Sequence, residues 1–128
     1  MMDIDYLKKI NDTHGHHVGD VVLKAVATIA KEQVGDSGVI GRYGGEEFLI
    51  ILPDFSLNNA NKIGELIRRS IEEYRYPIIK DVYGKVTVSL GIYEFTKKDE
   101  SLIDGLKKAD KALYKAKAIG KNVSVNYI

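Results

Sequence analysis

The stretch GRYGGEEFLIILP, residues 41–53, carries the signal that decides the fold of this chain. Strand-like segments rich in branched and aromatic residues lie on both sides of Gly44-Gly45. Two successive glycines favour a tight hairpin with a type I′ turn, because that turn needs positive φ at both central residues. The stretch therefore predicts an antiparallel hairpin whose turn runs directly into two carboxylates, Glu46 and Glu47.

Outside this hairpin, three segments place apolar residues at the spacing of an amphipathic helix. The first helix is expected to end at Gly35, the second to start after a Ser56 N-cap, and the third to end at Gly120. Their apolar faces are Val22, Val26, Ile29 and Ala30, then Ala60, Ile63, Ile67 and Ile71, and finally Leu102, Leu106, Ala109, Leu113 and Ala116. A shorter helical stretch is expected before Gly15.

Further strands are expected at both ends of the chain and in a second hairpin over residues 77–95, turning near Tyr83-Gly84. In its second arm the apolar and polar or small residues alternate, which predicts a half-buried strand; the apolar ones are Val86, Val88, Leu90 and Ile92. The sum is one domain of class α+β over residues 1–128, with a mainly antiparallel central sheet covered by helices.

Composition excludes several classes of protein. With 45% hydrophobic and 29% charged residues, the chain has the make-up of a soluble globular domain. The net charge of +1 argues against nucleic acid or a membrane surface as a partner. The absence of cysteine excludes disulfides and thiolate metal sites and fits a cytoplasmic location. The apolar runs are too short to span a bilayer.

The acidic residues are the candidates for chemistry. Asp3 and Asp5 lie where the opening strand ends, and Glu46 and Glu47 follow the glycine turn. Mg²⁺ prefers a few carboxylates together with phosphate oxygens, so strand-end carboxylates beside glycines suit a nucleotide–metal site. Alternation along a strand sends Glu46 and Glu47 to opposite faces, so at most one of them needs to face Asp3. On spacing alone, solvated turn residues are the stronger explanation for these acids.

Four blocks in order resemble the GGDEF family, the diguanylate cyclase domains, with a GGEEF signature. They are DIDYLKKINDTHGHHVGD at 3–20, RYGGEEF at 42–48, VTVSLGI at 86–92 and ADKALYKAKAIGKN at 109–122. The resemblance covers most of the chain and implies the palm-like fold of nucleotidyl cyclases. It also implies that this chain is a single GGDEF domain that lacks the N-terminal helix usual in the family.

Residue by residue, the resemblance implies the following site. The metal ligands for Mg²⁺, or Mn²⁺ in its place, are the carboxylates of Asp3 and Glu46 with the Ile4 carbonyl, and Glu47 is a second metal contact or helps to activate the 3′-hydroxyl. Asn11 and Asp20 resemble the pair that reads guanine, whose donors suit a carboxylate. The phosphates are implied to contact Lys8, Lys117 and Lys121 and the backbone of Tyr6 and Leu7. Gly44 and Gly45 are implied to leave space for the GTP to lie against the backbone.

The implied reaction condenses two GTP into cyclic di-GMP with release of pyrophosphate, at the interface of two such domains. A sensory domain in the parent protein would be the further partner. The alternative is a catalytically silent module that binds GTP or cyclic di-GMP, although such members usually lose acids that are present here. Without the resemblance, local roles are the better explanation for both residues, Asn11 as a turn residue and Asp20 as an N-cap.

One departure from the family bears on regulation. An R-x-x-D product site usually precedes the signature, and the corresponding positions here are Gly35 and Gly38. Because the arginine fork is missing, tight product binding at that place is not expected. The three histidines between Asp12 and Val18 are assigned no metal.

Overall fold

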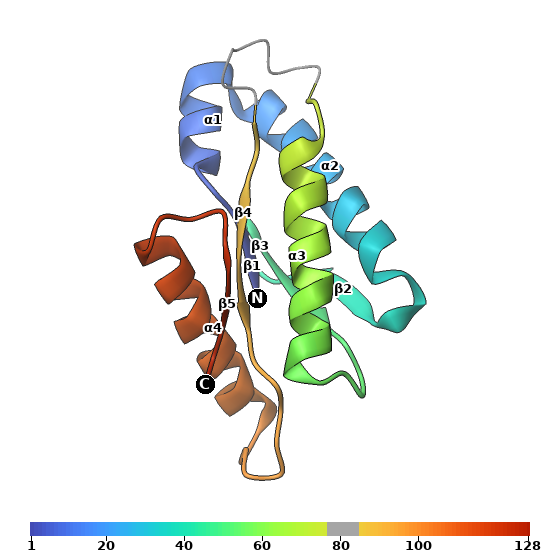
Figure 1. The fold of residues 1–128 in the computed structure, drawn as a ribbon. Helices are drawn as coiled ribbons and strands as arrows, with labels where there is room; N and C mark the ends of the chain where they lie inside the picture. The colour runs from blue at the N-terminus through green and yellow to red at the C-terminus, as the bar shows by residue number, and fades with distance from the viewer. Residues whose placement is uncertain (77–84) are drawn as a thin grey trace.

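The computed structural model describes residues 1–76 and 85–128. Its five-stranded sheet has the strand order β2-β3-β1-β4-β5 (Figure 1). The elements are β1 (Met2–Ile4), α1 (Leu7–His14), α2 (His16–Val34), the 3₁₀-helix η1 (Gly35–Ser37), β2 (Val39–Arg42), β3 (Glu47–Ile51), α3 (Leu57–Glu73), β4 (Val88–Ile92), α4 (Leu102–Ala118) and β5 (Ser124–Asn126). All neighbouring strands pair antiparallel except β4 and β5, which are parallel. The predicted α+β class with a mainly antiparallel sheet is confirmed.

The helix ends follow the predicted capping chemistry. Ser56 precedes α3, and its hydroxyl accepts a hydrogen bond from the Asn59 backbone amide at 3.2 Å. Gly35 ends α2 with a positive φ of 52°. α2 starts at His16, earlier than its apolar period indicates, so Asp20 lies inside the helix. The alternative role of Asp20 as an N-cap is therefore wrong.

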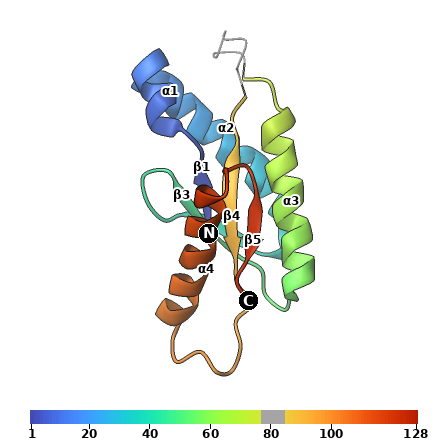
Figure 2. The ribbon, with the colours of Figure 1, turned by 60° about the vertical axis from the view of Figure 1, so that its left-hand side comes forward.

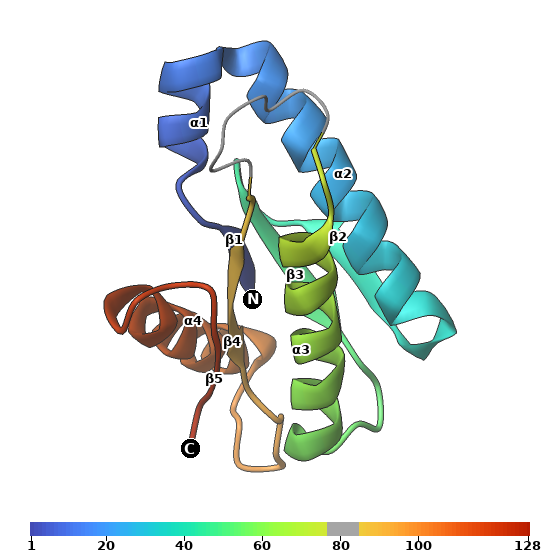
Figure 3. The same ribbon diagram turned by 45° about the horizontal axis from the view of Figure 1, so that its top comes forward.

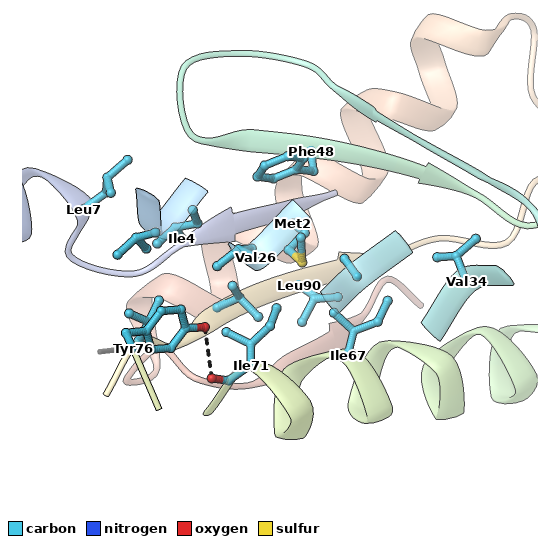
Figure 4. Close-up of a cluster of buried hydrophobic side chains, with 14 of the residues drawn as sticks. Met2, Ile4, Leu7, Val26, Val34, Phe48, Ile67, Ile71, Tyr76 and Leu90 are labelled. Atoms are coloured by element: carbon cyan, nitrogen blue, oxygen red, sulfur yellow. Dashed lines mark hydrogen bonds between the residues drawn. The ribbon is translucent and has the colours of Figure 1, made fainter. Parts of the chain in front are cut away.

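Helices cover both faces of the sheet. In Figures 1 and 3, α2 and α3 lie on one face and α4 lies on the other. The larger core, shown in Figure 4, joins β1, β3 and β4 to α2 and α3 through side chains such as Met2, Phe48, Val26 and Ile67. A smaller cluster, which includes Leu113, packs beneath α4.

The expectation of a half-buried strand at β4 is wrong, because helices cover the sheet from both sides. The β4 residues from Val88 to Leu90 are all buried, including Ser89, instead of alternating between buried and exposed. The reason is that α3 and α4 both pack on β4, which lies inside the sheet. The predicted turn near Tyr83-Gly84 lies outside the described residues. Within the described part of the chain, no helix is long and apolar enough to cross a membrane.

The predicted hairpin forms, but its turn differs from the prediction. β2 and β3 pair antiparallel, with Arg42 opposite Phe48. Neither Gly44 nor Gly45 has a positive φ, so the predicted type I′ turn is wrong. The loop holds more residues than the two of a type I′ turn, which removes the requirement for positive φ at both glycines.

The conformation of this loop is set by hydrogen bonds to its backbone. The Glu47 carbonyl accepts from the Tyr43 amide at 2.9 Å and from the Gly44 amide at 3.3 Å. The Arg42 guanidinium donates to the Gly44 and Gly45 carbonyls at 3.2 and 2.5 Å. The arginine of the signature therefore braces the loop that carries the two glutamates.

Candidate active site

The acidic site forms where β1 and β3 lie side by side. Asp3 on β1 pairs with Glu47 on β3 and with Ser89 on β4. Directly paired residues of antiparallel strands share a face, so Asp3 and Glu47 point the same way. Glu46 lies just before β3, and its carbonyl accepts a hydrogen bond from the Ile4 amide at 3.3 Å, which ties the loop to β1. The structure thus brings Asp3, Ile4, Glu46 and Glu47 together.

Within the described part of the chain, the Asp3 carboxylate has a partner for only one of its two oxygens. Its Oδ2 lies 3.4 Å from Lys117 Nζ, and its side chain is only 14% exposed. Its buried Oδ1 has no hydrogen-bond partner among the described residues. Burial raises the pKa of Asp3 to about 6; Lys117 opposes this rise, and the nearby Glu46 and Glu47 add to it. A cation placed beside Oδ1 would satisfy this oxygen and relieve the repulsion among the carboxylates.

This donor set fits a magnesium ion. Asp3 and Glu46 supply carboxylates, and Mg²⁺ commonly takes only one or two of these with the remaining positions left to phosphate and water. The described residues contain no group of three or more acidic, histidine or cysteine side chains arranged as a metal cage. The Ile4 carbonyl accepts from Lys117 Nζ at 3.3 Å, and a carbonyl oxygen has a second lone pair for a further partner.

The raised pKa of Asp3 leads to a testable effect on stability. Because folding disfavours ionised Asp3, the free energy of unfolding is higher below pH 4, where Asp3 is neutral, and it falls as the pH rises through 6. We expect Asp3→Asn, measured without metal or nucleotide, to raise the free energy of unfolding at pH 7.5 by about 1–2 kcal/mol, after allowance for partial solvent screening. At pH 4 the variant and the wild type should differ little. Urea unfolding at the two pH values measures this.

Asp99→Asn is the matched control, because its shift has the opposite sign. Hydrogen bonds from Lys108 and the Thr96 amide hold the pKa of Asp99 at about 2. Its ionised form therefore stabilises the fold above pH 4, and the asparagine variant should be less stable at pH 7.5. An Asp3→Asn variant that is also less stable at pH 7.5 would contradict the assignment of Asp3 as an unsatisfied carboxylate.

Asp5, a candidate acid in the sequence to which the family resemblance assigned no role, is the structural anchor beneath the site. It is 1% exposed and accepts four hydrogen bonds. The donors are Thr87 Oγ1 at 2.8 Å, Ser89 Oγ at 2.7 Å, Lys117 Nζ at 2.7 Å and the Asn122 amide at 3.0 Å. Burial alone would raise the pKa of Asp5, but these hydrogen bonds outweigh it and hold the pKa below its usual value. The signal available in the sequence was the pair of hydroxyls in an otherwise apolar strand.

The phosphate-binding candidates gather around the start of α1. Tyr6, the N-cap, is left-handed with φ 59°, and no side chain in the described structure caps this helix end. Lys121 Nζ lies 3.9 Å from the centroid of the Tyr6 ring. Leu7 is buried and Lys8 is exposed in the first turn. The helix terminus and Lys121 together present positive charge and backbone amides, which is the chemistry that binds phosphate.

The guanine-reading candidates lie further along the same helix. The Asn11 side chain rests on α2 at Gly19, where a Cβ would come within 1.7 Å of Asn11 Oδ1. That oxygen is buried and, within the described residues, has no hydrogen-bond partner. Asp20 follows directly on α2 and is exposed. Gly19 therefore allows α1 to approach α2 closely, and the approach leaves one acceptor and one carboxylate for a ligand.

A cavity of about 810 Å³ lies away from these residues. It is lined by apolar side chains of α3, β4, α4 and the segment after β3, among them Ile63, Ile92 and Leu106. Among the described residues, none of the candidate site residues lines it. Because the lining of this cavity is apolar, like core that is left uncovered, we place the active site at the strand ends instead. In Figure 2 the loop between β2 and β3 projects beyond the sheet, between α1 and α4 in that view.

The five-stranded mixed sheet with helices on both faces defines the class of this protein as an α+β domain. The family described as "Diguanylate cyclase, GGDEF domain" matches residues 1–123, and the chain belongs to this family. Diguanylate cyclase A of Treponema denticola is 43% identical over 125 residues, which are 95% of this chain and 33% of that relative. The chain spans about a third of the length of the curated relatives that it matches.

Solved structures support the same assignment. The active GGEEF domain of a diguanylate cyclase from Vibrio cholerae superposes with a TM-score of 0.91 at 33% identity, covering 99% of this chain and 80% of that chain. The GGDEF domain of DgcB from Caulobacter crescentus, solved in complex with c-di-GMP, gives 0.90 at 32% identity and covers 98% and 74%. The resemblance found in the sequence is confirmed.

Proposed function

We propose that this domain is a diguanylate cyclase, which condenses two GTP into cyclic di-GMP and releases pyrophosphate. The observation that carries the proposal is the half-buried Asp3 side chain, whose buried Oδ1 has no hydrogen-bond partner among the described residues and which lies near Glu46, Glu47 and Lys117. Such a carboxylate costs stability unless a cation binds it, so its presence indicates a metal site rather than a solvated turn.

The residues divide into three roles. Asp3, Glu46 and the Ile4 carbonyl would hold the magnesium ion, which would supply charge neutralisation at the phosphates and a lowered pKa of the attacking 3′-hydroxyl. Lys117, Lys121, Lys8 and the amides of the first turn of α1 bind the triphosphate. Asn11 and Asp20 accept hydrogen bonds from the donors on the guanine edge. Glu47, paired with Asp3, supports the ion or the 3′-hydroxyl.

One domain holds one GTP, whereas the product contains two guanosine units. Each 3′-oxygen attacks the α-phosphate of the other nucleotide, and each attack expels one pyrophosphate. The two sites must therefore face each other in a dimer, and the exposed position of the loop with Gly44 and Gly45 suits this approach.

Product inhibition at the usual family position is not expected here. Gly35 occupies the place of the arginine, and Gly38 that of the aspartate. A Cβ at Gly38 would lie 2.0 Å from the Ile51 carbonyl oxygen, so the backbone leaves no room for a side chain there. This close approach supports the proposal that the chain has no product site of the R-x-x-D type.

The test is product analysis after incubation with GTP and Mg²⁺ at several protein concentrations. We expect cyclic di-GMP and pyrophosphate, with a rate per molecule that rises with protein concentration until the dimer saturates. Chelation of Mg²⁺ should stop the reaction. GTP binding without any product at concentrations where the protein is dimeric would support the alternative, a silent nucleotide-binding module, and would refute the cyclase proposal.

A further inference from the structure

The segment that carries Lys121 has an unusual backbone. After α4, the residues Gly120, Lys121 and Asn122 all have positive φ, at 131°, 64° and 50°. Glycine tolerates this conformation and asparagine does so moderately, whereas lysine rarely adopts it. Two neighbouring non-glycine residues in this region persist only where surrounding contacts hold them.

The first of those contacts comes from α4 itself. The Lys121 amide donates to the Ala116 carbonyl at 3.0 Å, and the Ile119 amide donates to the Lys115 carbonyl at 3.0 Å. The former is the long hydrogen bond of a Schellman motif, with Gly120 at the position where glycine is preferred. This motif ends the helix but does not by itself direct the next residue toward the active site.

Asn122 supplies the other contacts, and it does so in two directions. Its backbone amide donates to Asp5 Oδ2 at 3.0 Å, beneath the acidic site. Its side chain turns toward α3, where Oδ1 accepts from the Arg68 guanidinium at 2.9 Å and Nδ2 donates to the Glu72 carboxylate. The segment after α4 passes over the end of the sheet toward α3, as Figure 2 shows. Asn122 thus links β1 to α3.

The partners on α3 are themselves held in place. Arg68 Nε donates to Glu65 Oε2 at 2.7 Å, and its guanidinium lies 3.9 Å from Glu72. The Arg68 side chain is only 15% exposed, so water competes weakly for these bonds. One face of α3 therefore presents a fixed donor and a fixed acceptor to the Asn122 amide group.

From this geometry we infer that Asn122, held by Arg68 and Glu72, is a positioning residue for substrate phosphates. It fixes the left-handed turn that places Lys121 over Tyr6, and its backbone completes the Asp5 cluster that holds Lys117. Arg68, Glu72 and Asn122 act through the two lysines and do not touch the substrate. This inference rests on the proposed function in that the lysines are taken as phosphate contacts.

The experiment compares three variants in GTP titrations with Mg²⁺ and in cyclase kinetics. Asn122→Ala loses both the tolerant backbone and the side-chain bonds, Asn122→Gly loses only the bonds, and Arg68→Met removes the partner on α3. All three should raise the Kd for GTP about tenfold, because the lysines that contact the phosphates remain in the protein but are moved out of position. The KM should rise in parallel, while kcat at saturating GTP changes less than about threefold.

Asn126→Ala is the matched control. Asn126 accepts a hydrogen bond from Asn61 on α3 at 2.8 Å, so it joins β5 to the same helix by the same chemistry, away from the lysines. It should lower the melting temperature about as much as Asn122→Gly and leave the Kd for GTP at the wild-type value.

Four outcomes would overturn the inference. The first is a Kd for GTP at the wild-type value in Asn122→Gly, whatever the other variants show, and the second is a wild-type Kd in Arg68→Met. The third is a rise of the Kd in Asn126→Ala as large as that in the Asn122 variants. The fourth is wild-type protein that binds no GTP. The last would also refute the proposed function. Wild-type protein that binds GTP but forms no product would refute the proposed function alone, and the tenfold shifts in Kd would still support the positioning role.

Discussion

Glu46→Gln is expected to reduce cyclic di-GMP formation about 1000-fold or more. A metal contact is worth several kcal/mol of charge stabilisation in the transition state, and each 1.36 kcal/mol is tenfold in rate. The amide keeps the size of the side chain and removes its charge, and the Glu46 carbonyl that accepts from Ile4 is unaffected. Product formation by the purified variant, measured with Mg²⁺ and saturating GTP, tests this.

The control for this experiment is Glu32→Gln, an exposed position on α2 with the same change of side chain. It should leave the rate at the wild-type level. The loss in Glu46→Gln should also occur without loss of stability, because neutralising one carboxylate lowers the repulsion that acts on Asp3. A variant of Glu46 that retained more than about a tenth of the wild-type rate would show that this carboxylate is not a metal ligand.

Asp5→Asn is expected to have the largest effect on stability, a loss of about 3–5 kcal/mol. The substitution removes the charge beside Lys117 and replaces one of the two acceptor oxygens by an NH₂ donor, so two of the four donors that Asp5 satisfies lose their acceptor inside the cluster. Since the pKa of Asp5 is lowered, the contribution of its ionised form is present above its unfolded pKa near 4 and is lost on further acidification. Urea unfolding of both proteins at pH 7.5 gives the difference directly.

Asp36→Asn, at an exposed position in η1, is the comparison for this substitution and should change stability by less than about 0.5 kcal/mol. If Asp5→Asn lost no more than Asp36→Asn, the cluster around Asp5 would not be a structural anchor. The expected result also separates two neighbouring acids: Asp5 stabilises the fold, whereas Asp3 destabilises it in the absence of a cation.

Much of the fold was predictable because it depends on local patterns. The N-cap at Ser56, the helix end at Gly35 and the antiparallel pairing around Phe48 each follow from a short stretch of residues. The expectation for β4 was wrong because distant segments decide its burial: two helices cover the strand from both faces. The predicted turn type was wrong for a local reason, since the loop between Arg42 and Glu47 is longer than the two residues of a type I′ turn.

For the candidate site, the sequence alone determined the family. It also contains the residue types that we propose for the chemistry: acids at strand ends, an amide and a carboxylate for guanine, and lysines in the last turn of the last helix and just after it. It could not determine that one Asp3 oxygen has no hydrogen-bond partner among the residues that the structure describes, while Asp5, two residues later, accepts from four donors. It also gave no sign that Asn122 joins α3 to the lysines. These properties arise from contacts between residues 50 to more than 100 positions apart, whose burial and hydrogen bonding exist only once the chain has folded.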